Sequence, residues 1–285
     1  MDWIEQMRSA IKYMEDHLTE PFDIGTIAKT ACSSEFHFQR LFHMITGVTV
    51  AEYVRRRRLT LAAQELFVGN EKIIDIAFKY GYDTPESFSK AFRRTHGFSP
   101  STVRKVGTVL KAYPPITFQI SIKGDQNMEY KIEKREAFKL VGKGKRISSV
   151  NGENFKLIPE FWDECHQSGF VDQLMKAQGA LGTLGVCMDF AQDMSEFTYF
   201  IGIEKPEQDL DGVEEVTIQE ATWAKFESIG PMPEAIQKVW GRIFSEFFPA
   251  TNYEHAVGPD LEVYYDGNPN DPNYLSEVWI PVVTK

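Results

Sequence analysis

Residues 27–42 read IAKTACSSEFHFQRLF, and this stretch predicts a helix, a tight turn and a second helix. A related stretch, IAFKYGYDTPESFSKAF, follows at 76–92. A helix-turn-helix needs a small residue where its helices cross and one apolar stripe along its second helix. Both stretches supply these features at matching positions, which are Ile27, Ala28, Phe38 and Phe42 in the first and Ile76, Ala77, Phe88 and Phe92 in the second. Gly47 and Gly97 follow the two stretches at matching positions. The sequence therefore predicts two helix-turn-helix units.

The segment between the two units predicts one long helix. Residues 51–67, AEYVRRRRLTLAAQELF, are rich in good helix formers. A rigid helical spacer would hold two recognition helices at the distance needed to enter successive major grooves. The four arginines 55–58 supply clustered positive charge, and we expect them to meet DNA phosphates.

The second helix of each unit has a polar face opposite its apolar stripe, and we expect this face to be exposed and to contact DNA. Gln and Arg suit adenine and guanine edges, Phe suits a thymine methyl group, and Glu can accept from cytosine. Basic side chains farther along each helix suit phosphates. The candidate DNA-binding residues are Phe36, Gln39, Arg40, His43, Glu86, Ser87, Lys90, Arg93 and Arg94.

Charge divides the 285-residue chain, whose net charge is −10. Residues 1–107 carry a net charge of +2, whereas residues 108–285 carry −12. Such asymmetry indicates two domains with different partners. We expect an all-α domain at 1–107, a connection at 108–127 and a second domain at 128–285.

The second domain mixes strand and helix patterns. Helices are predicted at 153–167 and 232–248, each between pairs of strands, so strand-strand-helix-strand-strand is written twice. Ile158 and Trp162 recur 78 residues later as Ile236 and Trp240, which favours an internal duplication. The pattern predicts an α+β fold. The predicted strands are 129–134, 137–147, 181–190, 196–204, 214–219, 222–229, 260–266 and 275–283, and the alternation of Ile116, Phe118, Ile120 and Ile122 predicts a further strand before the polar turn 123–127.

Targeting and metal-binding patterns are missing from the sequence. The opening MDWIEQMRSAIKYMEDHL predicts an amphipathic helix rather than a signal peptide, and no apolar run could span a bilayer. The three cysteines are far apart, and His166 and His255 have no metal-ligand spacing. We therefore expect a cytoplasmic protein with reduced thiols, no metal and no cofactor.

The first domain resembles the DNA-binding domain of the AraC/XylS family over roughly residues 5–106. The stretch 27–42 quoted above carries the resemblance, together with Tyr80-Gly81-Tyr82, Gly97-Phe98-Ser99-Pro100 and Arg104. The resemblance implies that both recognition helices of one monomer reach promoter DNA. Pro85 and Glu86 depart from the uncharged polar residues common in the family.

The second domain resembles the GyrI-like effector-binding domain. The short motifs that carry this resemblance are Ile158-Pro159-Glu160-Phe161-Trp162, Trp223 to Gly230-Pro231, Trp240, Leu261-Glu262-Val263-Tyr264 and Glu277-Val278-Trp279-Ile280-Pro281. The resemblance implies two halves packed as a pseudo-twofold pair, with an aromatic cleft that holds a glutamate and binds lipophilic cations.

The chemistry of such a cleft selects the candidate ligand residues. Aromatic walls and a buried carboxylate favour a flat organic cation. Glu277 is the preferred central carboxylate and Glu262 the second, although either could be a solvated strand residue. Pseudo-symmetry would place Tyr199 near Glu277. The candidate effector-binding residues are Glu277, Glu262, Tyr264, Trp162, Phe161, Tyr199, Trp223 and Trp240, of which the tryptophans could also be core residues.

These patterns together predict a DNA-binding transcription regulator that senses a small lipophilic effector. A buried carboxylate in the cleft would favour a cationic one. RNA polymerase is a further candidate partner. Two alternatives remain for the second domain, namely hydrolysis of small electrophilic compounds and binding of a protein. Catalysis is disfavoured because the chain has no G-x-S-x-G nucleophile motif and no phosphate-binding glycine loop.

Overall fold

The chain forms two compact units. The computed structural model describes residues 3–103, 109–117 and 127–284. Unit 1 comprises Met1–Glu35 and Val50–Ser121, and unit 2 comprises Phe36–Thr49 and Ile122–Lys285. The recognition helix of the first helix-turn-helix stretch is therefore grouped with the C-terminal sheet.

Unit 1 is built from helices, as the sequence predicts. Its elements are α1 (Trp3–Asp16), α2 (Ile24–Thr30), α4 (Val50–Val68), α5 (Ile73–Lys79), α6 (Pro85–His96) and the 3₁₀ turn η1 (Pro100–Thr102). The caps follow ordinary helix chemistry: the Asp23 side chain accepts from the Gly25 N–H before α2, and the Thr84 side chain accepts from the Ser87 N–H before α6. Gly97, at φ +90°, ends α6 in the left-handed conformation that favours glycine.

The second helix-turn-helix unit has a closely packed core. Ala77 of α5 and Phe88 and Phe92 of α6 are completely buried. Leu59 and Leu66 of α4 belong to the same apolar cluster, so the long helix supports this unit. The small side chain at position 77 allows the close packing that the sequence pattern predicts.

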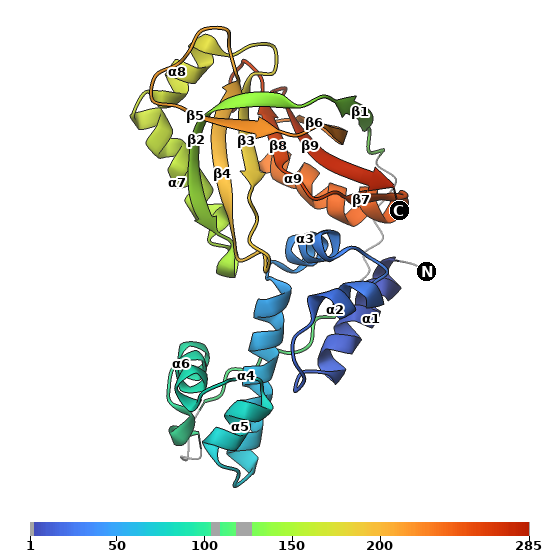
Figure 1. Ribbon diagram of the computed structural model, residues 1–285, viewed down its shortest axis with the longest axis vertical. Helices are drawn as coiled ribbons and strands as arrows, with labels where there is room; N and C mark the ends of the chain where they lie inside the picture. The colour runs from blue at the N-terminus through green and yellow to red at the C-terminus, as the bar shows by residue number, and fades with distance from the viewer. Residues whose placement is uncertain (1–2, 104–108, 118–126, 285) are drawn as a thin grey trace. The chain divides into compact units, whose positions relative to one another are not determined.

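Unit 2 combines a curved antiparallel sheet with helices (Figure 1). Its strands are β1 (Lys131–Arg135), β2 (Phe138–Ser148), β3 (Thr183–Met188), β4 (Glu196–Glu204), β5 (Glu214–Ile218), β6 (Ala221–Ile229), β7 (Tyr253–His255), β8 (Asp260–Tyr264) and β9 (Leu275–Thr284). Its helical elements are α3 (Glu35–Thr46, from Phe36 onward), the 3₁₀ turn η2 (Val150–Gly152), α7 (Asn154–Gln167), α8 (Phe170–Ala177), α9 (Glu234–Arg242), the π turn η3 (Ile243–Phe247) and α10 (Phe248–Ala250).

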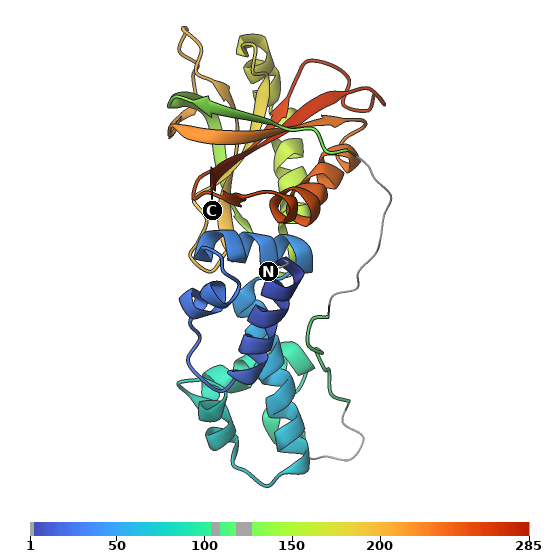
Figure 2. The ribbon, with the colours of Figure 1, turned by 90° about the vertical axis from the view of Figure 1, so that its right-hand side faces the viewer.

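The strand order supports the predicted duplication. The sheet runs β1-β6-β9-β8-β3-β4-β2-β5, with β7 pairing with β9. The order reflects onto itself about the β8–β3 pair, so that β9 corresponds to β4 and β6 to β2. Each half therefore contributes equivalent strands. The first strand of each half pairs with a strand of the other half: β1 pairs with β6, and β5 pairs with β2. Figure 2 shows the strands crossing one another as the sheet curves.

The two faces of the sheet pack differently. On one face, Phe161 and Cys165 of α7 pack with Tyr199 and Ile201 of β4. We call this the helix face. On the other face, strand residues such as Leu184, Val263 and Trp223 form a second core with one another. Both faces bury apolar side chains, which is why the central strands β3 (TLGVCM) and β4 (EFTYFIGIE) have near-continuous apolar sequences.

The observed elements differ from the predicted ones in a few places. All eight strands predicted from residue 129 onward are present, with ends shifted by at most two residues, whereas α8 and β7 were not predicted. The predicted helix 232–248 begins at Glu234 and changes to a π turn at Ile243. Residues 109–117 carry neither helix nor strand, and most of the predicted strand at 116–122 and of the turn at 123–127 lies outside the described residues.

Candidate functional site

Unit 2 contains a cavity of about 690 Å³ on the helix face of the sheet. Trp162 of α7 and Trp240 of α9 line it together with the sheet residues Tyr199, Glu262 and Tyr264. Its other lining side chains are largely apolar, among them Ile158, Pro159, Phe190, Met232 and Ile236. The size and the apolar lining suit a drug-sized organic molecule.

Glu262 lies at the centre of a hydrogen-bonded aromatic cluster. Its Oε1 accepts from Trp240 Nε1 at 2.8 Å. Its Oε2 accepts from the hydroxyls of Tyr199 at 3.0 Å and Tyr264 at 2.8 Å. Trp162 Nε1 in turn donates to the Tyr199 hydroxyl at 3.0 Å. Four aromatic side chains are thus positioned directly or indirectly by one carboxylate.

The Glu262 carboxylate is buried, and its hydrogen-bond donors are neutral side chains. Only 8% of the residue is exposed. Burial raises the pKa of Glu262, and hydrogen bonds from Trp240, Tyr264 and Tyr199 partly oppose that rise. Among the described residues, no Lys, Arg or His forms an ion pair with this carboxylate. A ligand that brought a positive charge would therefore gain a counter-charge in a low-dielectric site.

Gly185 of β3 makes the cluster sterically possible. It pairs with Glu262 across the β3–β8 ladder. A Cβ atom at this position would lie 2.2 Å from the Tyr199 hydroxyl and 3.1 Å from Glu262 Oε2. Any side chain here would displace the tyrosine, so glycine is required by close approach. The sequence predicts that residue 185 lies in the strand 181–190 but gives no signal that its glycine shapes the site.

The structure brings together five of the eight candidate effector residues. Phe161 is buried in the core beneath α7, and Trp223 is buried in the core of the opposite face. The role predicted for Glu277 is wrong in its geometry: Glu277 pairs with Val263 and therefore points to the face opposite Glu262. Its carboxylate accepts from Trp279 Nε1 at 2.6 Å. The expected proximity of Tyr199 to Glu277 is replaced by the hydrogen bond from Tyr199 to Glu262.

The exposed face of α6 carries the candidate residues of the second helix-turn-helix unit. All five are exposed, namely Glu86, Ser87, Lys90, Arg93 and Arg94. Glu86 and Ser87 lie in the first turn of α6, immediately after the Thr84 cap. This arrangement leaves polar and basic side chains available to a DNA groove.

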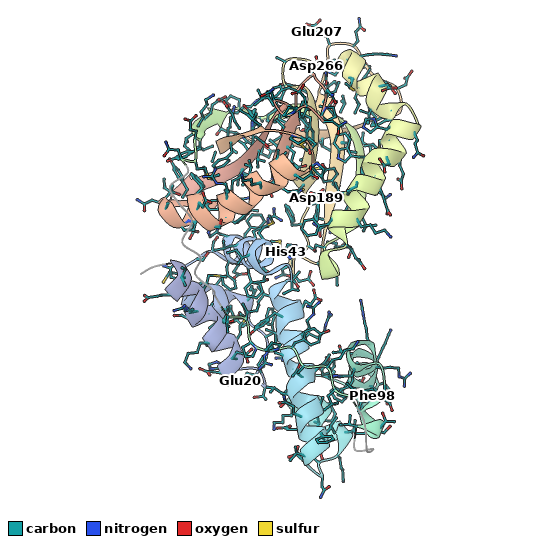
Figure 3. The ribbon with its side chains drawn as sticks, turned by 180° about the vertical axis from the view of Figure 1, so that it is seen from behind. Glu20, His43, Phe98, Asp189, Glu207 and Asp266 are labelled. Atoms are coloured by element: carbon teal, nitrogen blue, oxygen red, sulfur yellow. The ribbon has the colours of Figure 1, made fainter. Side chains whose placement is uncertain are left out.

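The corresponding face of α3 is covered, contrary to the expectation that it is exposed. Gln39, Arg40 and His43 are only 7%, 7% and 8% exposed. Phe36 is half-buried, and its ring lies 5.1 Å from the His255 ring. Arg40 and His43 also line the cavity described above, together with Met44 and Gly47 (His43 is labelled in Figure 3).

Burial changes the protonation of His43. Removal from water, reinforced by the positive charge of Arg40, lowers the pKa of His43 to about 4. The imidazole is therefore neutral at physiological pH. A phosphate contact by charged His43 is inconsistent with this conformation and would require α3 to be exposed.

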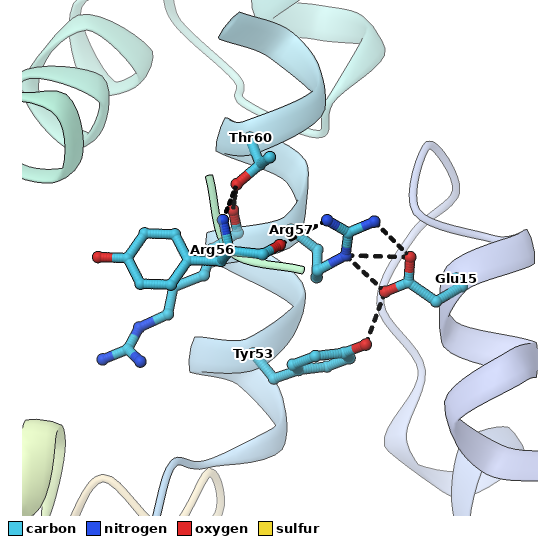
Figure 4. A network of polar contacts seen from close by, with 6 residues as sticks. Glu15, Tyr53, Arg56, Arg57 and Thr60 are labelled. Carbon is cyan, nitrogen blue, oxygen red and sulfur yellow. Dashed lines mark hydrogen bonds and ion pairs between the residues drawn. The ribbon is translucent and has the colours of Figure 1, made fainter. Parts of the chain in front are cut away.

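The arginine run 55–58 has structural partners, which corrects the expectation of a free phosphate-binding cluster (Figure 4). Arg57 is buried against Glu15 and donates to the Tyr113 carbonyl. Arg58 donates to the carbonyl oxygens of Leu18 and Glu20. Arg56 forms an ion pair with Glu52 one helical turn before it. Arg55 is the member of the run that is exposed.

The described residues contain neither a metal-binding cluster nor a membrane-spanning helix. No group of three or more His, Cys, Asp or Glu side chains there could hold a metal ion. None of the helices in those residues is long and apolar enough to cross a membrane. The three cysteines are free thiols, with Cys165 buried and Cys32 exposed.

Comparison with known proteins gives consistent matches in both parts of the chain. Residues 128–283 match the GyrI-like small molecule binding domain, and residues 27–106 match a helix-turn-helix domain. Regulatory protein SoxS of Salmonella typhimurium is 38% identical over 98 residues, which cover 34% of this chain and 92% of SoxS. The HTH-type transcriptional activator AarP of Providencia stuartii is 41% identical over 92 residues, covering 32% of this chain and 68% of AarP.

A solved structure shares its fold with more than half of this chain. It is described as SAV2435 bound to tetraphenylphosphonium, and it aligns with a TM-score of 0.50 at 23% sequence identity. The alignment covers 55% of this chain and 94% of that protein.

Proposed function

This chain belongs to the family with a GyrI-like small molecule binding domain and is an AraC-type DNA-binding regulator, and from this premise we propose that Glu262 is the recognition centre for a lipophilic organic cation. The observation that carries the proposal is a buried carboxylate hydrogen-bonded by three neutral aromatic side chains at the wall of a large apolar cavity.

A bound organic cation would stabilise the occupied cavity relative to the empty one. A buried charge is costly unless it is paired, and neutral hydrogen-bond donors offset only part of that cost. An organic cation would neutralise Glu262, and its apolar body would bury surface against Ile158, Pro159 and Ile236. Indole and phenol rings add cation–π attraction. The proposal therefore favours a bulky cation over a neutral or anionic molecule of the same shape.

The related fold supports a choice of probe. SAV2435 binds tetraphenylphosphonium, a bulky cation with four apolar rings. That protein is too distant in sequence to transfer residue roles. The cation nevertheless has the size and chemistry that the cavity of this chain would accept.

Nucleophilic catalysis by the cavity cysteine or tyrosine is disfavoured because both side chains are protonated. Cys187 lines the cavity, but burial and the nearby charges of Glu262 and Asp260 raise its pKa well above the ordinary value. The pKa of Tyr199 is also raised well above its ordinary value, for the same two reasons of burial and the charge of Glu262. Both groups stay protonated at neutral pH and are poor nucleophiles or bases.

We also propose that the regulator reads promoter DNA with both helix-turn-helix units in the cytoplasm. In α6, Glu86, Ser87 and Lys90 would reach base edges and Arg93 and Arg94 would contact phosphates. Once α3 is exposed, Phe36, Gln39 and Arg40 would read the second half-site, and His43 would contact a phosphate. RNA polymerase is the protein partner that a promoter-bound regulator would contact.

Ligand titration tests the role of Glu262. Tetraphenylphosphonium and tetraphenylborate have nearly the same shape and opposite charges, and tryptophan fluorescence of the full-length protein follows binding of each. We expect saturable binding of the cation only. Glu262→Gln should weaken this binding by about tenfold or more, equivalent to about 1.4 kcal/mol.

Glu277→Gln is the matched control, because it removes the same charge from the opposite face of the sheet. It should leave cation affinity unchanged. Equal binding of both ions, or equal effects of the two substitutions in proteins with unchanged circular dichroism, would contradict the proposal.

A further inference from the structure

The DNA-reading face of α3 is packed against the ligand-binding part of unit 2. Arg40 forms an ion pair with Asp260 of β8, and its guanidinium carbon lies 4.5 Å from the centre of the Phe190 ring. Phe36 approaches the same Phe190 ring edge-on, with ring centres 6.0 Å apart. Figure 3 labels His43 on this helix and Asp189 next to Phe190 in the β3–β4 loop.

A second set of contacts continues along the same helix. His37 Nδ1 accepts from the backbone N–H of His255 at 3.0 Å. The His37 ring also packs edge-on against Phe248 of α10, with ring centres 4.8 Å apart. The contact surface thus combines an ion pair, a hydrogen bond and several aromatic contacts, all made by α3.

The surroundings of Asp260 favour a positively charged hydrogen-bond partner. It is completely buried, and its Oδ1 lies 2.6 Å from His255 Nε2. Burial alone would raise the pKa of this carboxyl, but the charges of His255 and Arg40 keep it below the ordinary value. A buried carboxylate that lost Arg40 would lose much of its compensation, so the ion pair favours the packed position of α3.

We propose that the packing of α3 on Asp260 is an autoinhibited state. In this state the Asp260 carboxylate binds Arg40, which would otherwise read DNA. This inference rests on the proposed reading of DNA by α3 and adds how that reading is controlled. Arg40 cannot bind Asp260 and a guanine edge at once. Because the face of α6 is exposed, the inhibited molecule binds one half-site, and release of α3 adds a second.

The number of conserved half-sites tests the inference. Operators are selected in vitro from random duplex DNA with full-length wild-type protein and with the Asp260→Asn and Phe190→Ala variants. Wild type should select one conserved half-site. Both variants weaken the contacts that hold α3, so they should select two half-sites about one helical turn apart.

Affinities for the selected duplexes provide the quantitative test. Both variants should bind a two-half-site duplex at least tenfold more tightly than wild type, and should bind a duplex with the α3 half-site scrambled as wild type does. Asp189→Asn is the matched control, because it removes a neighbouring exposed charge. It should behave as wild type.

The outcomes separate this inference from the proposed function. Two half-sites and equal affinities for wild type and variants would overturn autoinhibition while keeping DNA reading by α3. One half-site for every protein, with no effect of Arg40→Ala, would overturn DNA reading by α3 itself. If Asp260→Asn fails to fold by circular dichroism, Phe190→Ala decides the question, because it leaves the buried charges in place.

Discussion

Arg57 and Glu15 are 42 residues apart in the chain, and their side chains meet in a two-pronged ion pair between α4 and α1. Arg57 Nε lies 2.8 Å from Glu15 Oε1, and Arg57 Nη2 lies 2.7 Å from Oε2. The Tyr53 hydroxyl donates to the same carboxylate at 2.7 Å. Because this arginine is 7% exposed, its charge stabilises unit 1 and is not available to DNA.

Replacing Arg57 tests this structural role. We expect Arg57→Ala to lower the free energy of unfolding of unit 1 by about 2 kcal/mol, because it leaves Glu15 and the Tyr113 carbonyl without their strongest partner. Arg55→Ala, at the exposed position of the same run, should change stability by less than about 0.5 kcal/mol. Urea unfolding followed by circular dichroism gives both values. Equal losses would show that Arg57 has no special structural role.

The arginine run shows where sequence reasoning succeeds and where it stops. The periodicity of 51–67 predicts a helix, and α4 spans Val50–Val68. Helical phase alone, however, does not say which arginine meets an acidic group from a distant helix. Glu15 lies on a segment that the sequence predicts only as an amphipathic helix. Local pattern therefore predicts the element, and tertiary packing decides the role of each charge.

The two candidate glutamates illustrate the same limit in the sheet. Successive strand residues point to opposite faces, so the strand register decides whether Glu262 and Glu277 share a face, and a shift of one residue reverses the outcome. The observed register pairs Glu262 with Val278 and Glu277 with Val263, which separates them. Both faces are apolar, and the sequence has no polar face to indicate which glutamate is inside. Tyr264, two residues after Glu262, was the available signal, because the two share a face.

Acidification should weaken cation binding if Glu262 is the counter-charge. Burial raises the pKa of Glu262, so protonation begins at a higher pH than for an exposed glutamate. The ionised form binds the cation, and affinity should fall by up to about tenfold per pH unit below that pKa. Tetraphenylphosphonium does not titrate, so titrations between pH 7.5 and 5 report on the protein. A wild-type profile as flat as that of Glu262→Gln would exclude this carboxylate.

His43 should make unit 2 less stable in acid. Its pKa is about 4 in the folded chain and near 6.5 when exposed, so the unfolded chain binds a proton first as the pH falls. Stability attributable to neutral His43 is intact above pH 6.5 and is lost progressively between 6.5 and 4. At pH 5 the loss is about 2 kcal/mol.

Comparison with His43→Asn isolates this contribution. Urea unfolding at pH 7.5 and pH 5, followed by tryptophan fluorescence, should show a smaller acid loss in the variant than in wild type. His96, whose pKa burial also lowers, lies in α6 of unit 1 and is not part of this difference. An identical acid loss in both proteins would mean that His43 is exposed in solution, and therefore that α3 is not packed as described.

Ligand and DNA should oppose each other through α3. The cavity is lined on one side by Glu262 and Trp240 and on another by Arg40, His43 and Met44 of α3. A ligand that fills it contacts both sides, so it binds the packed state more tightly and shifts the population toward that state. By reciprocity, DNA that engages α3 should weaken ligand binding by the same factor.

In the Asp260→Asn variant, in which α3 is released, saturating tetraphenylphosphonium should therefore reduce affinity for a duplex with two half-sites several-fold, and leave affinity for a duplex with only the α6 half-site unchanged. Fluorescence anisotropy of labelled duplexes measures both, and tetraphenylborate controls for non-specific effects of an apolar ion. Adding Glu262→Gln to this variant should weaken the antagonism in proportion to the loss of ligand affinity. Tighter binding of the two-half-site duplex with ligand present would reverse the conclusion, because the ligand would then prefer the state in which α3 is released from Asp260.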